Sequence, residues 1–264
     1  MPSAKPHSFL PAPREKRPET GAFVFPGPRD RVTINGMTGS GKSTFALWLF
    51  AESADFDKKP WIFIDFKSED IIQQALREDL FEKLDVGGRI PKKPGVHVVS
   101  HNPRDGQQPV IDFLWKVYEA GRIGLFVDEA TMIPEVRGEA NSGGPFQSIL
   151  SQGRSKEIPV YTLAQRPVNV NKMIYSENNY YSAFRLRSKD DLKRVTDHIP
   201  ESSTNYERVW LKNGKEVPLK GEFWSRWYDA QKDTSFLLRP CPPREKILDI
   251  LAGRLDNQKA HGAI

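Results

Sequence analysis

Apolar residues recur along the chain in short runs that alternate with amphipathic stretches, from residue 31 to about residue 197. Near-continuous apolar runs predict buried parallel strands, and apolar residues at helical spacing predict helices between them. We expect strands at residues 31–35, 61–66, 96–100, 123–127, 160–163 and 180–186. We expect helices at residues 42–51, 69–84, 110–119, 146–152 and 188–197. This alternation predicts an α/β fold, with a mostly parallel sheet flanked by helices.

The two ends of the chain have different patterns. Asn213-Gly214 lies between apolar segments at residues 208–211 and 216–219, which is a strong hairpin signal. After a proline cluster, residues 244–255 have the pattern of an amphipathic helix. Residues 1–22 are rich in Pro, Lys and Arg and predict a flexible arm. We therefore expect three parts: a basic arm at 1–22, a core at 23–200, and a C-terminal extension of hairpin and helix at 201–264.

Composition limits the class of protein. Of the 264 residues, 38% are apolar, which is enough for a packed core, and no run approaches the roughly 18–20 apolar residues of a membrane span. Residues 1–17 lack an apolar segment, so we expect no secretory signal. The single cysteine, Cys241, excludes an internal disulfide and fits a reducing cytoplasm. The net charge of +5 fits a nucleic-acid partner, but also a plain solvated surface.

A glycine-rich segment follows the first predicted strand. Residues 36–43 have the spacing Gly-x4-Gly-Lys-Ser, and a predicted helix comes directly after. Glycines let the backbone wrap phosphates, Lys42 places a charge near the β and γ phosphates, and Ser43 offers a hydroxyl to Mg²⁺. The dipole of the following helix favours the same anion. The predicted nucleotide-binding residues are Gly36, Met37, Thr38, Gly39, Ser40, Gly41, Lys42, Ser43 and Thr44.

A second motif, residues 124–129, is an apolar strand that ends in two acids. Asp128 is the candidate metal ligand that joins Ser43 at Mg²⁺, and Glu129 can polarise the attacking water. The doubled acid favours ATP hydrolysis over a GTPase switch, and the guanine-reading Asn-Lys-x-Asp pattern is absent from the sequence. The simpler alternative is an acidic pair that caps a helix.

Three further polar residues flank the strand predicted at 160–163. Gln165 follows the strand and can sense the γ-phosphate or its water. Arg154 precedes the strand and is a candidate finger that neutralises transition-state charge in a neighbouring subunit. Arg166 is the rival finger. Each could instead be an ordinary turn or surface residue.

This set of segments resembles the FtsK–HerA superfamily of DNA-pumping ATPases. The resemblance rests on Gly153-Arg154-Ser155, on Ala164-Gln165-Arg166-Pro167 after a short strand, and on Asp65-Phe66-Lys67; it covers residues 30–190. The compact size is similar to that of the genome-packaging ATPases of double-stranded DNA viruses. The resemblance implies a RecA-like core of the ASCE type and a homo-oligomeric ring, pentameric or hexameric, with DNA threaded through it. It also implies that the protein works in the host cytoplasm and docks on a capsid portal or vertex protein. It implies no membrane partner.

Several alternatives stay open. The chain could be a phage-assembly or conjugation-type ATPase that handles single-stranded DNA, although no membrane segment follows the core. It could also be a nucleotide-dependent switch that moves no DNA, against which Glu129 argues. The polar loop at 134–145 could face a DNA channel or only solvent, and Trp and Lys residues at 210–227 could contact DNA or pack in a core. His198 follows a predicted helix, and no His/Cys spacing suggests zinc.

Overall fold

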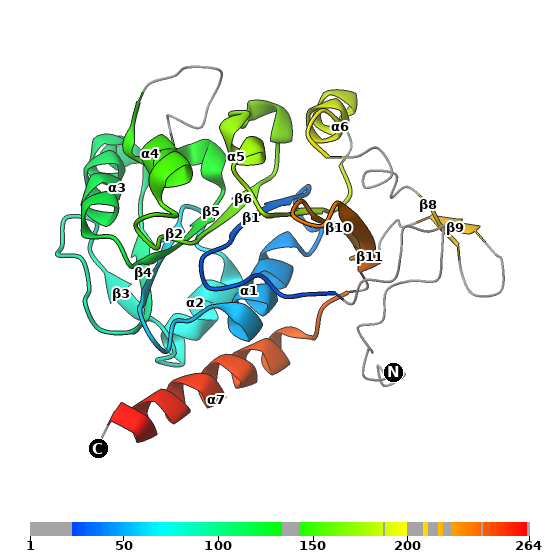
Figure 1. Ribbon diagram of the computed structural model, residues 1–264. Coiled ribbons are helices and arrows are strands. Elements are labelled where there is room, and N and C mark those ends of the chain that lie inside the picture. The colour runs from blue at the N-terminus through cyan, green and yellow to red at the C-terminus, as the bar shows by residue number, and fades with distance from the viewer. Residues whose placement is uncertain are drawn as a thin grey trace.

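The chain folds around a nine-stranded sheet that carries helices on both faces (Figure 1). This computed structural model describes residues 23–133, 143–186, 188–199, 208–210, 216–218, 223–238 and 240–262. The predicted arm at 1–22, most of the loop at 134–145 and the turn of the predicted hairpin lie outside these residues. Over the described residues, no helix is both long and apolar enough to cross a membrane.

The sheet combines a large parallel part with two antiparallel strands at one edge. Its strands, in sequence order, are β1 (Arg31–Asn35), β2 (Pro60–Asp65), β3 (Glu82–Leu84), β4 (Gly95–Ser100), β5 (Gly124–Asp128), β6 (Val160–Ala164), β7 (Tyr180–Ala183), β10 (Ser225–Asp229) and β11 (Thr234–Leu238). The spatial order is β11-β10-β7-β1-β6-β5-β2-β4-β3. Strand β6 lies between β1 and β5 and pairs in parallel with both. The strand that leads into the glycine-rich segment is therefore separated by one strand from the strand that ends in the two acids, as in a RecA-like P-loop core.

The helices form two layers. They are α1 (Lys42–Ser53), α2 (Asp70–Arg77), α3 (Gln108–Ala120), α4 (Pro145–Gln152), α5 (Met173–Ser176), α6 (Lys189–Thr196) and α7 (Arg244–Gly262). Figure 1 shows α3, α4, α5 and α6 above the sheet, and α1, α2 and α7 below it. Successive residues of a strand point to opposite faces of the sheet. Ile62 and Ile64 therefore pack on one face of the sheet, and Trp61 and Phe63 pack on the other.

Helix α1 is buried on nearly all sides, and α7 explains why. Phe50 packs under the sheet against Phe63, with ring centroids 4.8 Å apart. On the opposite side, Leu251 of α7 belongs to the same apolar cluster. Because α1 lies between the sheet and α7, its middle residues, 45–51, are all apolar and buried.

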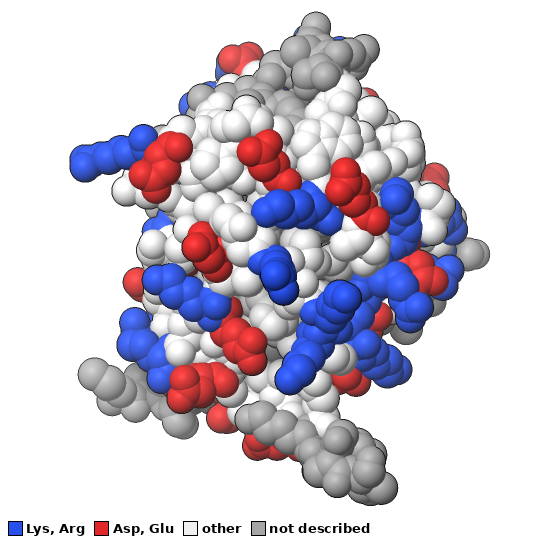
Figure 2. Space-filling model, turned by 90° about the vertical axis from the view of Figure 1, so that its left-hand side faces the viewer, with Lys and Arg blue, Asp and Glu red and all other residues white. Residues whose placement is uncertain are grey.

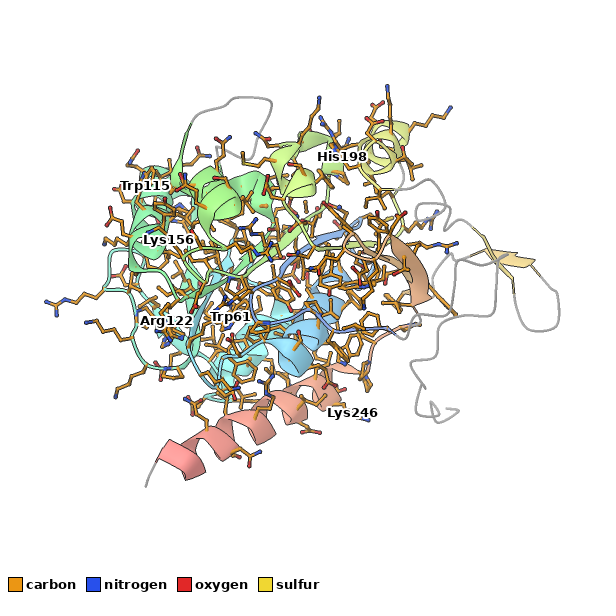
Figure 3. The ribbon with its side chains drawn as sticks, in the orientation of Figure 1. Trp61, Trp115, Arg122, Lys156, His198 and Lys246 are labelled. Atoms are coloured by element: carbon orange, nitrogen blue, oxygen red, sulfur yellow. The ribbon has the colours of Figure 1, made fainter. Side chains whose placement is uncertain are left out.

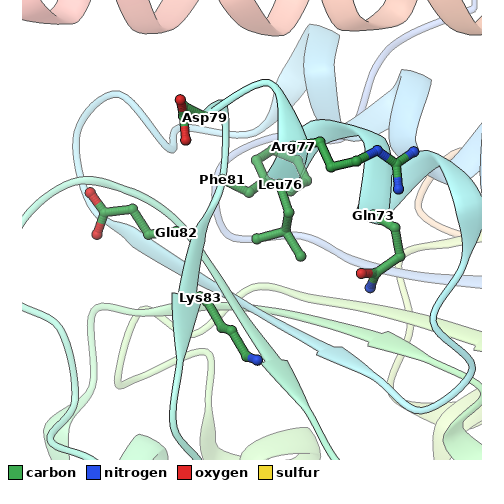
Figure 4. Close-up of a pocket in the computed structure, with 7 residues that line it drawn as sticks. All are labelled: Gln73, Leu76, Arg77, Asp79, Phe81, Glu82 and Lys83. Carbon is green, nitrogen blue, oxygen red and sulfur yellow. The ribbon is translucent and has the colours of Figure 1, made fainter.

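The segment predicted as one helix at 69–84 is instead a short helix and a strand. Helix α2 stops at Arg77, and Asp79 has a left-handed backbone with φ of 54°. Phe81 then packs into the core, and β3 pairs in parallel with β4. The resulting hollow between α2 and β3 is lined by Gln73, Leu76, Arg77, Asp79, Phe81, Glu82 and Lys83 (Figure 4). The long helix prediction was wrong because apolar residues of a turn and an edge strand happened to continue the helical spacing.

The C-terminal segment contributes more to the sheet than its sequence pattern predicted. The predicted hairpin is present as β8 (Arg208–Trp210) and β9 (Glu216–Pro218), which pair antiparallel. Strands β10 and β11 were not predicted; β10 pairs antiparallel with β7. Strand β7 is also shorter than predicted, ending at Ala183. Residues on both sides of position 200 thus share one sheet.

Candidate active site

The glycine-rich segment, called the P-loop from here on, lies at the carboxyl end of β1 and opens α1. Its start is anchored to both neighbouring strands: the Gly36 amide donates to the Ala164 carbonyl at 3.2 Å, and the Met37 amide donates to the Arg185 carbonyl at 3.2 Å. A side chain at Gly36 would collide with Phe184, whose Cβ lies 2.6 Å from the position of an added Cβ. Gly41 has φ of 88°, a left-handed conformation that glycine adopts without strain. The local sequence therefore fixes a loop whose backbone amides can face an anion.

Lys42 and Asp128 form the buried charged pair of the site. The Lys42 Nζ lies 3.9 Å from the Asp128 Oδ1, and the side chains are 4% and 0% exposed. Burial lowers the pKa of Lys42 and raises the pKa of Asp128 to about 7. The attraction between the two charges opposes burial in both cases. Neither carboxylate oxygen of Asp128 has a hydrogen-bond partner among the described residues. A buried carboxylate whose oxygens accept no hydrogen bond fits Mg²⁺, which prefers few carboxylates plus phosphate oxygens.

Glu129 is held by three groups from separate elements. Its Oε2 accepts from the Lys67 Nζ at 2.5 Å, and its Oε1 accepts from the Thr131 hydroxyl and from the backbone amide of Gln165, the latter at 3.4 Å. Its backbone is left-handed, with φ of 63°, which is strained for a residue with a side chain. Burial alone would raise the pKa of Glu129, but the hydrogen bonds from Lys67 and Thr131 and the charge of Lys67 lower it overall. Glu129 is therefore a carboxylate at neutral pH, the form that a general base needs.

The end of β2 positions Lys67. Asp65 is level with Asp128 in the sheet register, so the two strands end side by side. The Asp65 Oδ1 accepts from the backbone amides of Lys67 and Glu69, both at 3.2 Å, and its Oδ2 accepts from the Gln73 amide at 2.9 Å. These bonds turn the chain sharply after β2, which lets Lys67 reach Glu129. The sequence pattern of these residues was noticed, but the partnership of Lys67 with Glu129 was not predicted.

Gln165 and Arg166 lie at the same carboxyl end of the sheet. Both line a pocket with Met37 and Thr38 of the P-loop. The Arg166 Nε donates to the Asp191 Oδ2 at 2.8 Å, although the Arg166 side chain is 57% exposed. Arg166 is thus close to the nucleotide site of its own chain.

Arg154 lies at the opposite end of the sheet. It belongs to the turn between α4 and β6, and its charge acts on Arg31, the first residue of β1. Burial lowers the pKa of Arg31; Glu177 opposes this effect, and Arg154 adds a smaller lowering. The same end carries Lys156 and Arg122, at the left of Figure 3. Strand β6 separates Arg154 from Gln165, about 16 Å for five residues at about 3.3 Å each. Arg154 therefore cannot serve the P-loop of its own chain.

The structure brings together most of the residues singled out from the sequence: the P-loop with Lys42 and Ser43, the acids Asp128 and Glu129, and Gln165. It leaves Arg154 apart. His198 stacks on Tyr175, with ring centroids 5.1 Å apart. Figure 3 shows His198 beside α6.

Comparisons with known proteins identify the family. No protein-family model matches the chain. The DNA packaging ATPase P9 of Enterobacteria phage PRD1 is 32% identical over 223 residues, which span 84% of this chain and 92% of P9. In fold, the chain is similar to the genome packaging NTPase B204 of Sulfolobus turreted icosahedral virus 2, solved with AMPPCP. The TM-score is 0.58 at 18% identity, covering 82% of this chain and 100% of B204. It is also similar to EssC ATPases 2 and 3 of Geobacillus thermodenitrificans, with a TM-score of 0.55 at 11% identity, covering 88% of this chain and 45% of EssC.

These matches confirm the resemblance drawn from the sequence, the RecA-like P-loop fold and ATP hydrolysis as the activity. A relative that is 32% identical across most of both chains carries the assignment, and the solved structures support the fold. The chain belongs to the family of viral DNA-packaging P-loop ATPases, which resemble the FtsK–HerA ATPases.

Proposed function

We propose that the chain is a motor that uses ATP hydrolysis to move double-stranded DNA into a preformed viral capsid. The observation that carries this proposal is the cluster of Lys42, Asp128 and Glu129 at one end of the sheet. The chain aligns with 92% of the length of a DNA packaging ATPase, at 32% identity. An active site with both a metal-ligand acid and a separate base is suited to repeated turnover rather than to a single switching event.

ATP and Mg²⁺ are the proposed ligands of the P-loop. The backbone of residues 36–44 would surround the phosphates, with Lys42 against the β and γ phosphates. Ser43 and Asp128 would hold Mg²⁺, whose chemistry is to neutralise and bridge the phosphate oxygens. The free oxygens of buried Asp128 support this assignment.

Glu129 is the proposed general base. Its carboxylate would accept the proton of a water as that water bonds to the γ-phosphorus and the bond to the β,γ-bridging oxygen breaks. In the structure, Lys67 occupies one oxygen of Glu129 and Thr131 the other. We propose that Glu129 must exchange at least one of these partners for the water, and that Gln165, whose backbone amide donates to the same carboxylate, helps to orient the water.

A ring of identical subunits is the proposed working form. Arg154 lies at the end of the sheet far from its own P-loop, so it could act on a nucleotide only in a neighbouring subunit. We propose this role for Arg154, and a capsid portal or vertex protein as docking partner, in the host cytoplasm. Figure 2 shows basic and acidic side chains interspersed on the face at the left of Figure 1, so the net charge of +5 does not form one basic stripe there.

The test measures ATP hydrolysis and DNA movement together. Purified protein is assayed with no DNA, with linear double-stranded DNA and with single-stranded DNA of equal length. The double-stranded substrate carries a bound third-strand oligonucleotide, whose release reports movement along the duplex. We expect double-stranded DNA to raise the ATPase rate most, and the third strand to be released only when ATP is present. Glu129→Gln is the matched control, which should bind ATP and DNA but release nothing.

The other outcomes contradict the proposal in distinct ways. Stronger stimulation by single-stranded DNA, with no release of the third strand, would indicate a motor for single strands. ATP hydrolysis that no DNA changes would indicate a nucleotide-dependent protein that moves no DNA.

A further inference from the structure

We propose that Phe223 and Trp224, just before β10, form the subsite for the purine ring of the nucleotide. This inference rests on the proposed binding of ATP phosphates at the P-loop. It adds a second contact surface, which the phosphate-binding motifs do not contain. From the sequence, the Trp and Lys residues at 210–227 were considered only as DNA contacts or core residues.

The order of the strands sets the direction in which the base must extend. The catalytic acids, and therefore the γ-phosphate, lie on the β6 and β5 side of β1. A triphosphate bound along the P-loop with its γ end on that side directs its ribose and base to the other side of β1. The strands there are β7 and, beyond it, β10.

The loops at this place form a pocket beside the P-loop. Strand β10 runs antiparallel to β7, with Arg226 opposite Ala183, so the residues before Ser225 return to the carboxyl end of the sheet. A pocket at this end is lined by Met37, Thr38, Gly39 and Ser40 of the P-loop, by Phe184 and Arg185 after β7, and by Phe223 and Trp224. The P-loop and the two aromatic residues therefore face one cavity.

Phe223 has two features that packing does not explain. It is 54% exposed, and only Val24 is another exposed large apolar residue among those whose exposure the structure describes. Its backbone is also left-handed, with φ of 54°, a strained state that tends to occur at functional positions. The ring lies over the P-loop, where its Cδ1 is 3.0 Å from the position of an added Cβ on Gly41. An aromatic ring that is kept exposed beside a phosphate loop suits a flat ligand that stacks on it.

Stacking suits the purine of ATP, the nucleotide proposed for the P-loop, without selecting between adenine and guanine. Stacking on an aromatic side chain contributes about 1–3 kcal/mol per base, equivalent to about 5- to 150-fold in affinity, and every base has a π-face that can use it. We therefore expect the subsite to strengthen binding of ATP and GTP alike.

The experiment compares a ligand with a base to one without. Dissociation constants are measured by calorimetry for ATPγS and for inorganic tripolyphosphate, each with Mg²⁺, on the full chain. We expect Phe223→Ala to weaken ATPγS binding about tenfold or more while tripolyphosphate binding stays unchanged. Phe223→Trp should keep the affinity for ATPγS, and Val24→Ala, which shortens the other exposed apolar residue, should change neither ligand.

Each result decides one point. Unchanged ATPγS binding in Phe223→Ala would overturn the purine subsite. Equal weakening of both ligands would also overturn it, because Phe223 would then act through the shape of the P-loop. If the wild-type chain binds neither ligand, the failure lies with the proposed phosphate site itself.

Discussion

Lys42 is the buried cation of the proposed phosphate site, and its removal should abolish productive nucleotide binding. The side chain is 4% exposed and faces Asp128 at 3.9 Å, so water cannot replace its charge in Lys42→Ala. Charged hydrogen bonds of this kind contribute about 1.5–3 kcal/mol each, so we expect ATPγS affinity to fall at least about tenfold and hydrolysis to disappear.

Calorimetry and a phosphate-release assay measure these two effects of Lys42→Ala. Lys246→Ala, an exposed lysine on α7 labelled in Figure 3, is the control. Near-normal hydrolysis in Lys42→Ala would contradict the assignment of the P-loop.

Glu129 is the proposed base, and Glu129→Gln should separate binding from turnover. The amide is nearly isosteric with the carboxylate but cannot accept the proton from water, so loss of a general base typically slows the reaction about 10²–10⁴-fold. We expect ATP affinity within a few-fold of wild type and turnover at least about a hundredfold slower. Single-turnover measurements separate the two. A variant with wild-type turnover would assign the base to another residue.

Residues that carry a short local pattern could be identified from the sequence, and residues that depend on a distant partner could not. The spacing of Gly36, Gly41 and Lys42 is a local property of one loop, so it was enough to pick out the loop that we propose binds phosphate. Lys67 is 62 positions before Glu129, and the two meet only because β2 and β5 are neighbours in the sheet. Phe223 likewise reaches the P-loop only because an unpredicted strand, β10, returns to β7.

At the scale of elements, α7 is fastened to the end of α1 by one arginine. Arg254 donates to the carbonyls of Ala51 and Ala54 at 2.8 and 2.6 Å and pairs with Asp57 at 2.8 Å. Its guanidinium also lies over the ring of Phe56, 4.3 Å from the centroid. A cation at the carboxyl end of a helix stabilises the free carbonyls there.

We expect Arg254→Ala to lower the free energy of unfolding by about 2 kcal/mol, because several charged hydrogen bonds and a stacked ring are lost together. Urea unfolding, followed by circular dichroism, measures the change. Lys246→Ala on the same helix should stay within about 0.5 kcal/mol of wild type, as exposed substitutions usually do. Equal stability of Arg254→Ala and wild type would mean that α7 is held by its apolar face alone.

Whether an element could be predicted depended on how strongly its own residues specify it. Strands β1, β2, β4, β5 and β6 are buried runs of β-forming residues and were predicted within a residue or two. Strand β3 has the sequence Glu82-Lys83-Leu84, without a strand pattern, and exists because β4 offers it an open edge. Strands β10 and β11 are mixed in polarity and are stabilised by pairing with β7 and with each other. Pairing across the sheet is a property of the whole fold, which a window of residues does not contain.

At the scale of the whole molecule, the proposed phosphate site and the proposed arginine finger lie at opposite ends of the sheet of one chain. The P-loop and the acids Asp128 and Glu129 are at the carboxyl end, and Arg154 is at the other. In a head-to-tail ring, the end with Arg154 could meet the nucleotide of the next subunit. Arg154→Ala should then bind ATP normally yet hydrolyse it about 10³-fold more slowly or worse, as the loss of other arginine fingers does. Loss of ATP affinity in this variant would instead indicate a role within its own subunit.

Mixing two inactive variants tests whether Arg154 acts between subunits. Arg154→Ala keeps an intact Lys42 site but has no finger to offer, while Lys42→Ala has a dead site and an intact finger. In mixed rings, some interfaces join a working site to a working finger, and these should recover activity that neither variant has alone. The recovered rate should rise and fall with the mixing ratio and be highest when both variants are well represented.

Mixed oligomers are verified by pulling down a tag carried by one variant only. If they form and no ratio restores hydrolysis, Arg154 is not a finger in trans. The same mixing of Lys42→Ala with Arg166→Ala is the matched comparison. Because Arg166 lies beside its own P-loop and pairs with Asp191, no site in those rings is complete, and we expect no recovery.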